Sequence, residues 1–87
     1  MSDDPIRRLR EQIAERDRSV LEAVNARLRL VAELKRQKEV EGVDFVDPDQ
    51  EQRLLQALER ANAGPLSDDG VRQLFGEILA LTKRELD

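Results

Sequence analysis

The first forty residues of the chain place apolar side chains three or four positions apart, which is the period of one face of an α-helix. After Pro5, neither Gly nor Pro interrupts the pattern, so it predicts one long helix over about residues 5–40. We expect its start at Ser2, Asp3 or Asp4, whose side chains can cap a helix. The apolar stripe consists of Ile6, Leu9, Ile13, Val20, Val24, Leu28, Val31 and Leu34.

Two shorter helices are predicted after a linker of residues 41–47. The second covers about residues 48–62, because Asp47 is a favoured cap and the proline after it fits the first helical position. The third covers about residues 67–86, after an Asn-Ala-Gly-Pro break. Their apolar positions are Leu54, Leu55, Leu58 and Ala61 in the second helix, and Val71, Leu74, Phe75, Ile78, Leu79 and Leu81 in the third. No segment alternates like a strand, so the prediction is a single all-α domain over residues 1–87.

The first helix is too long for the other two to cover. About 34 residues at ~1.5 Å each span ~50 Å, whereas a compact chain of this length has a diameter nearer ~30 Å. A second copy would bury the far end, and an intertwined homodimer is the economical arrangement. A coiled-coil tail is the alternative, but Asp17 and Arg27 interrupt the stripe where a coiled coil has apolar residues.

The composition excludes much of the usual catalytic chemistry. The chain has no Cys, His, Trp or Tyr, which excludes disulfides, Cys-ligated zinc, and Ser–His or Cys–His nucleophiles. An enzyme of this composition works without an imidazole at neutral pH. The absent cysteines also fit a cytoplasmic protein.

The charges argue against a nucleic-acid or membrane partner. The 15 basic and 19 acidic residues give a net charge of −4, and only Phe45 and Phe75 are aromatic. The charge is uneven: residues 1–40 carry 10 basic and 8 acidic side chains, and the remainder carries 5 and 11. No apolar stretch approaches the ~18 residues of a membrane span, and the charged start lacks a signal-peptide apolar segment.

Two cations stand on or beside the apolar stripe. Lys38 follows Arg27 by eleven residues, which leaves the two side chains ~20° apart around the helix and ~16 Å apart along it. Either they extend past the edge of a core, or they face one anion together. Arg10 lies roughly 100° from Arg27, so it reaches the same ligand only from a partner's antiparallel helix and is otherwise a solvated charge.

Three further polar residues are candidates. Gln50 and Glu51 stand in the first turn of the second helix, where an acid is also favoured by the helix dipole. Thr82 interrupts the apolar side of the third helix, and a hydroxyl bonded back to its own helix is the simpler interpretation.

Taken in order, these residues resemble the all-helical (type II) chorismate mutases. The resemblance rests on Leu9-Arg10-Glu11-Gln12-Ile13, Asp17, Asn25-Ala26-Arg27, Lys38, Asp47-Pro48, Glu51, Leu54-Leu55, the break at 62–65, and Leu74-Phe75, Ile78 and Thr82. Each short motif is weak alone, but the ordered set extends from about residue 6 to residue 86.

The resemblance implies an intertwined dimer with two active sites that converts chorismate to prephenate, towards phenylalanine and tyrosine. By position, Arg10 of the partner subunit would hold one substrate carboxylate and Arg27 the other. Lys38 would donate to the ether oxygen of the breaking C–O bond and to a neighbouring carboxylate. Glu51 and the backbone of Asp47 would bind the ring hydroxyl.

Such a rearrangement is unimolecular and pericyclic, so it needs no nucleophile, general base, metal or cofactor. Catalysis would consist of holding the substrate dianion in its reactive shape and placing fixed cations where the ether oxygen gains charge. Arginine suits the carboxylates through its planar fork.

Three positions bear on the level of activity. Thr82 stands where the family usually has a small hydroxyl residue near a carboxylate. Gln50 replaces an Arg found in many relatives, and Leu86 replaces the Gln or Glu that is the second donor to the ether oxygen. Because losing such a donor costs ~2.7–4 kcal/mol, we expect a mutase that is slow alone. By analogy with some relatives, the enzyme of the first shikimate-pathway step would be an activating partner.

Two other interpretations stay open. An isochorismate-pyruvate lyase shares the fold and the cationic pocket of the family. A non-catalytic helical dimerisation or regulatory module would keep the same charges without turnover, and the Gln50 and Leu86 departures favour it modestly. The product formed from chorismate separates these interpretations.

Overall fold

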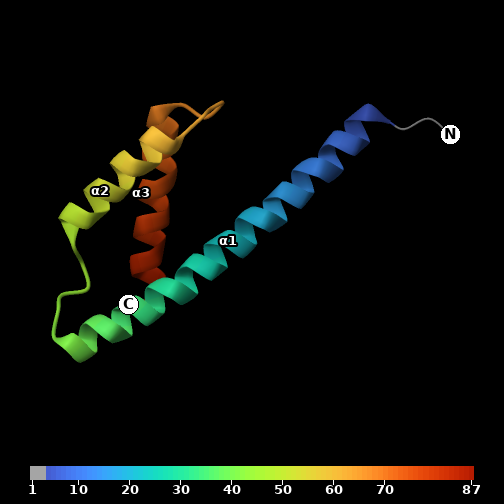
Figure 1. The fold of residues 1–87 in the computed structure, drawn as a ribbon. Helices are drawn as coiled ribbons and strands as arrows, with labels where there is room; N and C mark the ends of the chain where they lie inside the picture. The colour runs from blue at the N-terminus through green and yellow to red at the C-terminus, as the bar shows by residue number, and fades with distance from the viewer. Residues whose placement is uncertain (1–3) are drawn as a thin grey trace.

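Three helices and their connections make up the structure, a computed structural model that describes residues 4–87 (Figure 1). They are α1 (Pro5–Glu41), α2 (Pro48–Ala61) and α3 (Asp68–Glu85). The described residues form no strand. The predicted all-helical class with three helices and a long first helix is therefore confirmed.

The ends of α1 are set by local hydrogen bonds. The side chain of Asp4 caps the start by accepting a hydrogen bond from the Ile6 N–H at 3.0 Å. The other two cap candidates, Ser2 and Asp3, lie outside the described residues. The helix ends at Gly42, whose left-handed φ of 73° suits only glycine well. It therefore runs one residue past the expected end, to Glu41.

The shorter helices also begin at side-chain caps. Asp47 accepts a hydrogen bond from the Gln50 N–H at 3.1 Å, and Ser67 accepts one from the Gly70 N–H at 3.0 Å. Each cap satisfies a backbone donor that the first turn leaves without a helical partner. The Asp47 cap holds the linker between α1 and α2 at a defined entry into α2, which matters for the pocket described below.

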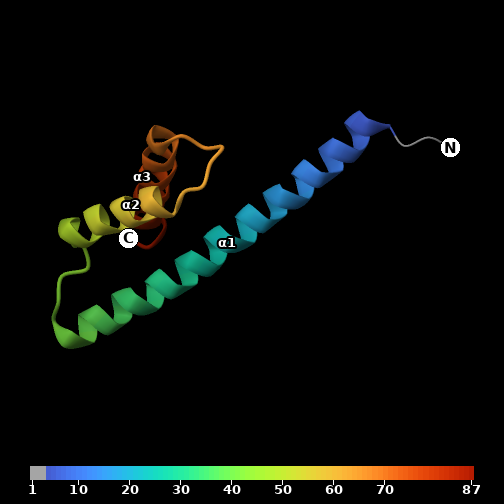
Figure 2. The same cartoon turned by 45° about the horizontal axis from the view of Figure 1, so that its top comes forward.

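The helices are arranged as a bundle with one long projecting arm. Figures 1 and 2 show α2 and α3 packed together beside the C-terminal half of α1, while its N-terminal half extends away from them. The chain measures 63 × 24 × 18 Å, with a radius of gyration of 17.1 Å. α1 packs against α3 and not against α2. The third helix is therefore the bridge that positions α2 relative to α1.

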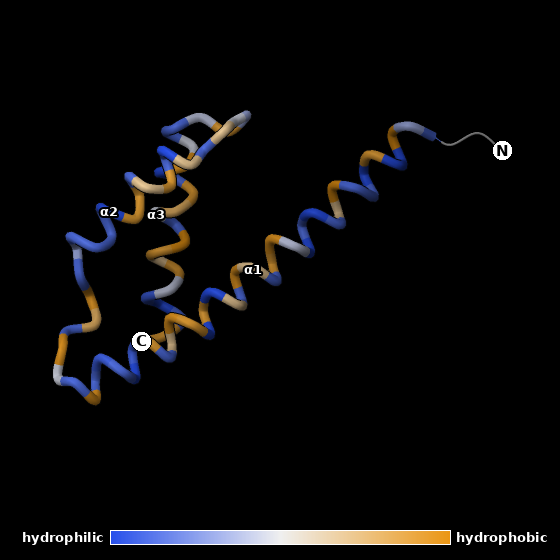
Figure 3. Tube along the Cα trace, viewed as in Figure 1, coloured by the Kyte–Doolittle hydropathy of each residue, from blue (hydrophilic) through white to orange (hydrophobic). Residues whose placement is uncertain are grey.

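A single chain buries very little apolar surface. Among the described residues only Val71 is a buried hydrophobic residue, and no residue of α1 is buried. Five apolar residues of the projecting half of α1 are each 59–62% exposed: Ile6, Leu9, Ile13, Val20 and Leu21. Figure 3 shows these apolar segments recurring along the arm. One chain thus leaves its longest apolar stripe uncovered.

Replacing each of two glycines by alanine tests this description of the helices, because the two replacements should change the free energy of unfolding in opposite directions. Gly42→Ala should lower the free energy of unfolding by about 1 kcal/mol, because an alanine is strained at a left-handed φ. Gly76→Ala should raise it by about 0.5–1 kcal/mol, because Gly76 lies within α3 with open space at its Cβ. Urea unfolding at one protein concentration measures both. A gain of stability in Gly42→Ala would contradict the cap.

Candidate active site

A pocket of about 230 Å³ lies between the C-terminal half of α1, the linker of residues 42–47, the first turn of α2 and the last turns of α3. Its apolar lining comes from Val31, Leu34, Phe45, Val46, Leu54 and Leu79. Its charged lining comes from Arg27, Lys38, Lys83, Asp47 and Glu51. Because α1 and α2 do not pack against each other, the space between them stays open to a ligand.

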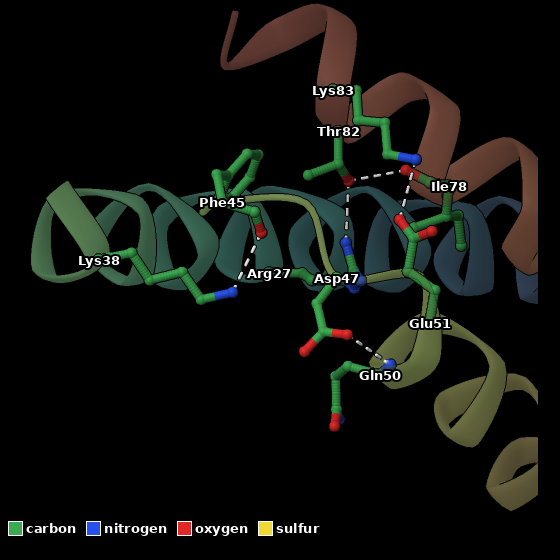
Figure 4. A network of polar contacts seen from close by, with 9 residues as sticks. All are labelled: Arg27, Lys38, Phe45, Asp47, Gln50, Glu51, Ile78, Thr82 and Lys83. Atoms are coloured by element: carbon green, nitrogen blue, oxygen red, sulfur yellow. Dashed lines mark hydrogen bonds and ion pairs between the residues drawn. The ribbon is translucent and has the colours of Figure 1, made fainter. Parts of the chain in front are cut away.

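Arg27 reaches from α1 to the last turns of α3 (Figure 4). Its Nη1 donates a hydrogen bond to the Thr82 hydroxyl at 2.8 Å, and that hydroxyl donates to the Ile78 carbonyl at 2.7 Å. Thr82 is only 5% exposed, so this contact is shielded from water. The hydroxyl thus bonds back to its own helix and also fixes the guanidinium, whose other N–H groups stay available to a carboxylate.

Lys38 reaches from the same face of α1 to the linker. Its Nζ donates to the Phe45 carbonyl at 3.0 Å, which leaves ammonium donors for a ligand. The Phe45 ring lies 6.0 Å from this Nζ and 5.5 Å from the Nζ of Lys35. Sequence reasoning counted Phe45 only as a rare aromatic, because its contacts depend on the path of the linker.

The start of α2 supplies the opposite wall of the pocket. The Asp47 carboxylate caps α2, because its Oδ1 accepts a hydrogen bond from the Gln50 N–H. The Gln50 amide oxygen accepts two hydrogen bonds from Arg53, at 3.3 and 3.1 Å. Gln50 therefore lines the pocket while its carbonyl oxygen is bound to the next turn of its own helix.

Glu51 forms an ion pair with Lys83 along one side of the pocket. The Lys83 Nζ lies 2.9 Å from Glu51 Oε1, joining the last turn of α3 to the first turn of α2 (Figure 4). Lys83 is a pocket residue that sequence reasoning missed. The only signal for it is its place directly after Thr82, since a lysine in a last helical turn is ordinarily explained by the helix dipole.

Two of the eight expected site residues lie away from this pocket. Arg10 is on the exposed half of α1, seventeen residues before Arg27, and thus ~25 Å along the helix. Leu86 is the C-cap of α3, and its backbone carbonyl accepts a hydrogen bond from Lys35. Its side chain lines a neighbouring pocket together with Lys35 and Arg84. The other six are Arg27, Lys38, Asp47, Gln50, Glu51 and Thr82, and all of them line the pocket.

Residues 4–87 contain neither a metal-binding cluster nor a membrane-spanning helix. No three His, Cys, Asp or Glu residues come together there in a way that could hold a metal ion. No helix of this range has the length and apolar character needed to cross a membrane.

Fold and site together define a small all-helical protein with fixed cations over an apolar floor, which suits a small anion with an apolar body. The sequence model of the chorismate mutase type II family matches residues 9–85. Because this match covers most of the chain, the chain belongs to that family. It is therefore an isomerase that acts on chorismate.

Solved structures agree with this assignment. Form I of chorismate mutase from Thermus thermophilus is 33% identical, with a TM-score of 0.89 over 91% of this chain and 99% of the other. Form II of the same enzyme is 32% identical, with a TM-score of 0.90 over 93% and 92% of the two chains. A search of curated proteins gives no match.

Thr82 offers a test of how the guanidinium is held. Thr82→Val keeps the volume but leaves the Arg27 Nη1 without its acceptor, so the free energy of unfolding should fall by about 2 kcal/mol. The value of kcat/KM for chorismate should fall with it, because the guanidinium loses its fixed position. Thr82→Ser retains the hydroxyl and should keep both quantities near those of the native protein. Equal losses of unfolding free energy and of kcat/KM in the two variants would show that the Thr82 hydroxyl does not hold the guanidinium.

Proposed function

We propose that the pocket between α1, α2 and α3 is where this chain rearranges chorismate to prephenate, by orientation and fixed positive charge and without a covalent intermediate. The observation that carries the proposal is the convergence of Arg27 and Lys38 on one pocket. Their backbones are far apart along α1, yet both side chains face the same apolar floor. Two anchored cations beside an apolar surface suit a dianionic substrate that contains a carbon ring.

The contacts of the two cations support the roles proposed for them. Thr82 fixes Arg27 at one side, and the rest of its planar fork is suited to a substrate carboxylate. The Phe45 carbonyl holds Lys38, and its remaining donors suit the ether oxygen and a nearby carboxylate. Both cations are in place before the substrate binds, so little reorganisation is needed as charge develops.

The ring hydroxyl is assigned to the α2 side of the pocket. Glu51 has one oxygen, Oε1, paired with Lys83, which leaves the other to accept a hydrogen bond from the hydroxyl. The backbone of Asp47, whose carbonyl also accepts a hydrogen bond from the Glu51 N–H at 3.1 Å, is the second proposed partner. These contacts orient the ring relative to the cations on α1.

The chemistry asks for no group that the chain lacks. In the rearrangement the ether C–O bond breaks while a C–C bond forms, and no proton is transferred. The barrier falls because the side chain of the substrate is held over the ring, and because Lys38 and Arg27 offset negative charge on the ether oxygen and carboxylate. A chain without His or Cys is sufficient for this reaction.

The proposed site is completed by a second copy of the chain. Arg10 lies too far along α1 to reach the pocket of its own chain, and it stands among the exposed apolar residues of the projecting arm. An antiparallel pairing of two such arms would bury both stripes and bring Arg10 of each to the pocket of the other. An intertwined homodimer with two shared sites is the arrangement that does both.

We also propose that the isolated enzyme is slow and works in the cytoplasm. The absence of cysteine supports the location. Neither the apolar Leu86 nor the neutral Gln50 supplies a cation or a strong donor to the ether oxygen, and the Leu86 side chain does not line the pocket. A partner enzyme that moves the turn containing Leu86 would raise the rate.

Purified protein mixed with chorismate should give prephenate, followed by the loss of chorismate absorbance and by identification of the product. Arg27→Ala and Lys38→Ala should each lose at least about a hundredfold in kcat/KM, because each removes a fixed cation. Arg36→Ala is the matched control, since its side chain is 69% exposed and lies outside the pocket.

Three outcomes of this assay contradict the proposal. If no prephenate forms at micromolar enzyme, the interpretation that remains is a non-catalytic helical dimerisation or regulatory module. Pyruvate released from isochorismate supports the lyase instead. Native activity in Arg27→Ala or Lys38→Ala, with the helical content unchanged, places the reaction elsewhere.

A further inference from the structure

Lys83 is a charged residue of the pocket to which the proposed reaction gives no direct role. It stands in the last turn of α3, and its Nζ lies 2.9 Å from Glu51 Oε1. The ion pair joins α3 to the first turn of α2 along one side of the pocket (Figure 4). The side chains of Lys83 and Glu51 are 46% and 28% exposed.

Helix–helix attachment does not by itself explain this pair. Ion pairs this open to water contribute little to stability. Within the described residues, α2 and α3 are also joined by Arg72 and Glu59, whose nearest atoms are 3.2 Å apart and whose exposures are similar, at 55% and 27%. That second pair lies outside the pocket. The two pairs have similar exposure and both join α2 to α3, but Arg72 also pairs with Asp69 of its own helix at 2.8 Å, and only Lys83–Glu51 lines the pocket.

The charge balance of the pocket depends on Lys83. Arg27 and Lys38 contribute two positive charges, and Asp47 and Glu51 contribute two negative charges, so these four cancel. Counting Lys83 as well, the pocket of one chain has a single net positive charge. With Arg10 supplied by a second copy, the site would carry two positive charges against the two negative charges of the chorismate dianion.

We propose that Lys83 is a positioning residue for the rearrangement, one that holds Glu51 for the ring hydroxyl and neutralises its charge. The inference rests on the proposed function of this pocket. With Oε1 bound to Lys83, the free oxygen of Glu51 is directed to a hydrogen-bond donor on the substrate. Without Lys83, Glu51 is an unpaired carboxylate that repels a dianion and turns freely.

The loss of Lys83 should therefore weaken substrate binding more than it slows the chemical step. In Lys83→Met the KM for chorismate should rise about tenfold, because a charged hydrogen-bond partner is lost, while kcat changes less. Lys83→Arg keeps the charge and the reach, and should restore most of the affinity. In a Glu51→Gln background, Lys83→Met should change KM less than about twofold, because no carboxylate remains to be held.

Arg72→Met is the matched control. It breaks the other ion pair between α2 and α3, together with the pair between Arg72 and Asp69, and removes the same charge from the chain without touching the pocket. Its KM should stay within about twofold of the native value, and its loss of unfolding free energy should be at least as large as that of Lys83→Met, because Arg72 loses two ion pairs. Steady-state kinetics with chorismate and urea unfolding of these variants make up the experiment.

The outcomes separate this inference from the function on which it rests. An inactive native protein overturns the proposed function. An active native protein with an inactive Arg27→Ala variant, but with equal KM values in Lys83→Met and Arg72→Met, overturns the role of Lys83 alone. A tenfold rise in KM that persists in the Glu51→Gln background also overturns it, since Lys83 would then act without Glu51.

Discussion

The structure depends on the contact between the middle of α1 and the last turns of α3, where Arg27 donates to the buried hydroxyl of Thr82. Because α1 packs against α3 and not against α2, this crossing decides where α2 lies. The space left between α1 and α2 becomes the pocket. The same hydrogen bond that supports the crossing also fixes the guanidinium at the pocket wall, so the fold and the site share one interaction.

The helices follow from local patterns, which is why the sequence predicts them well. The apolar period, the Asp47 and Ser67 caps and the break before the third helix are all signals within a few residues. Arg27 and Lys38 are predictable for the same reason, since helical geometry places them on one face. Lys83 is not, because its partner Glu51 is brought close only by the packing of α3 on α2.

Sequence patterns within one chain also leave open what covers its exposed apolar surface. The apolar residues on the N-terminal half of α1 stay exposed in one chain, and no residue of α1 is buried. Hydrophobic burial is the main stabilising term in folding, and a chain whose described residues include one buried hydrophobic side chain has little of it. Burial of this surface and the proposed role of Arg10 therefore favour the same arrangement, a second copy placed antiparallel along α1.

The central claim is that each site combines Arg27 of one chain with Arg10 of the other. Chains carrying Arg10→Ala and chains carrying Arg27→Ala should each be inactive alone. Unfolded together and refolded at equal amounts, half of the dimers are mixed, and each mixed dimer has one intact site, so about a quarter of the native activity should return. Mixed dimers that form, as shown by mass spectrometry, but remain inactive would contradict the shared site.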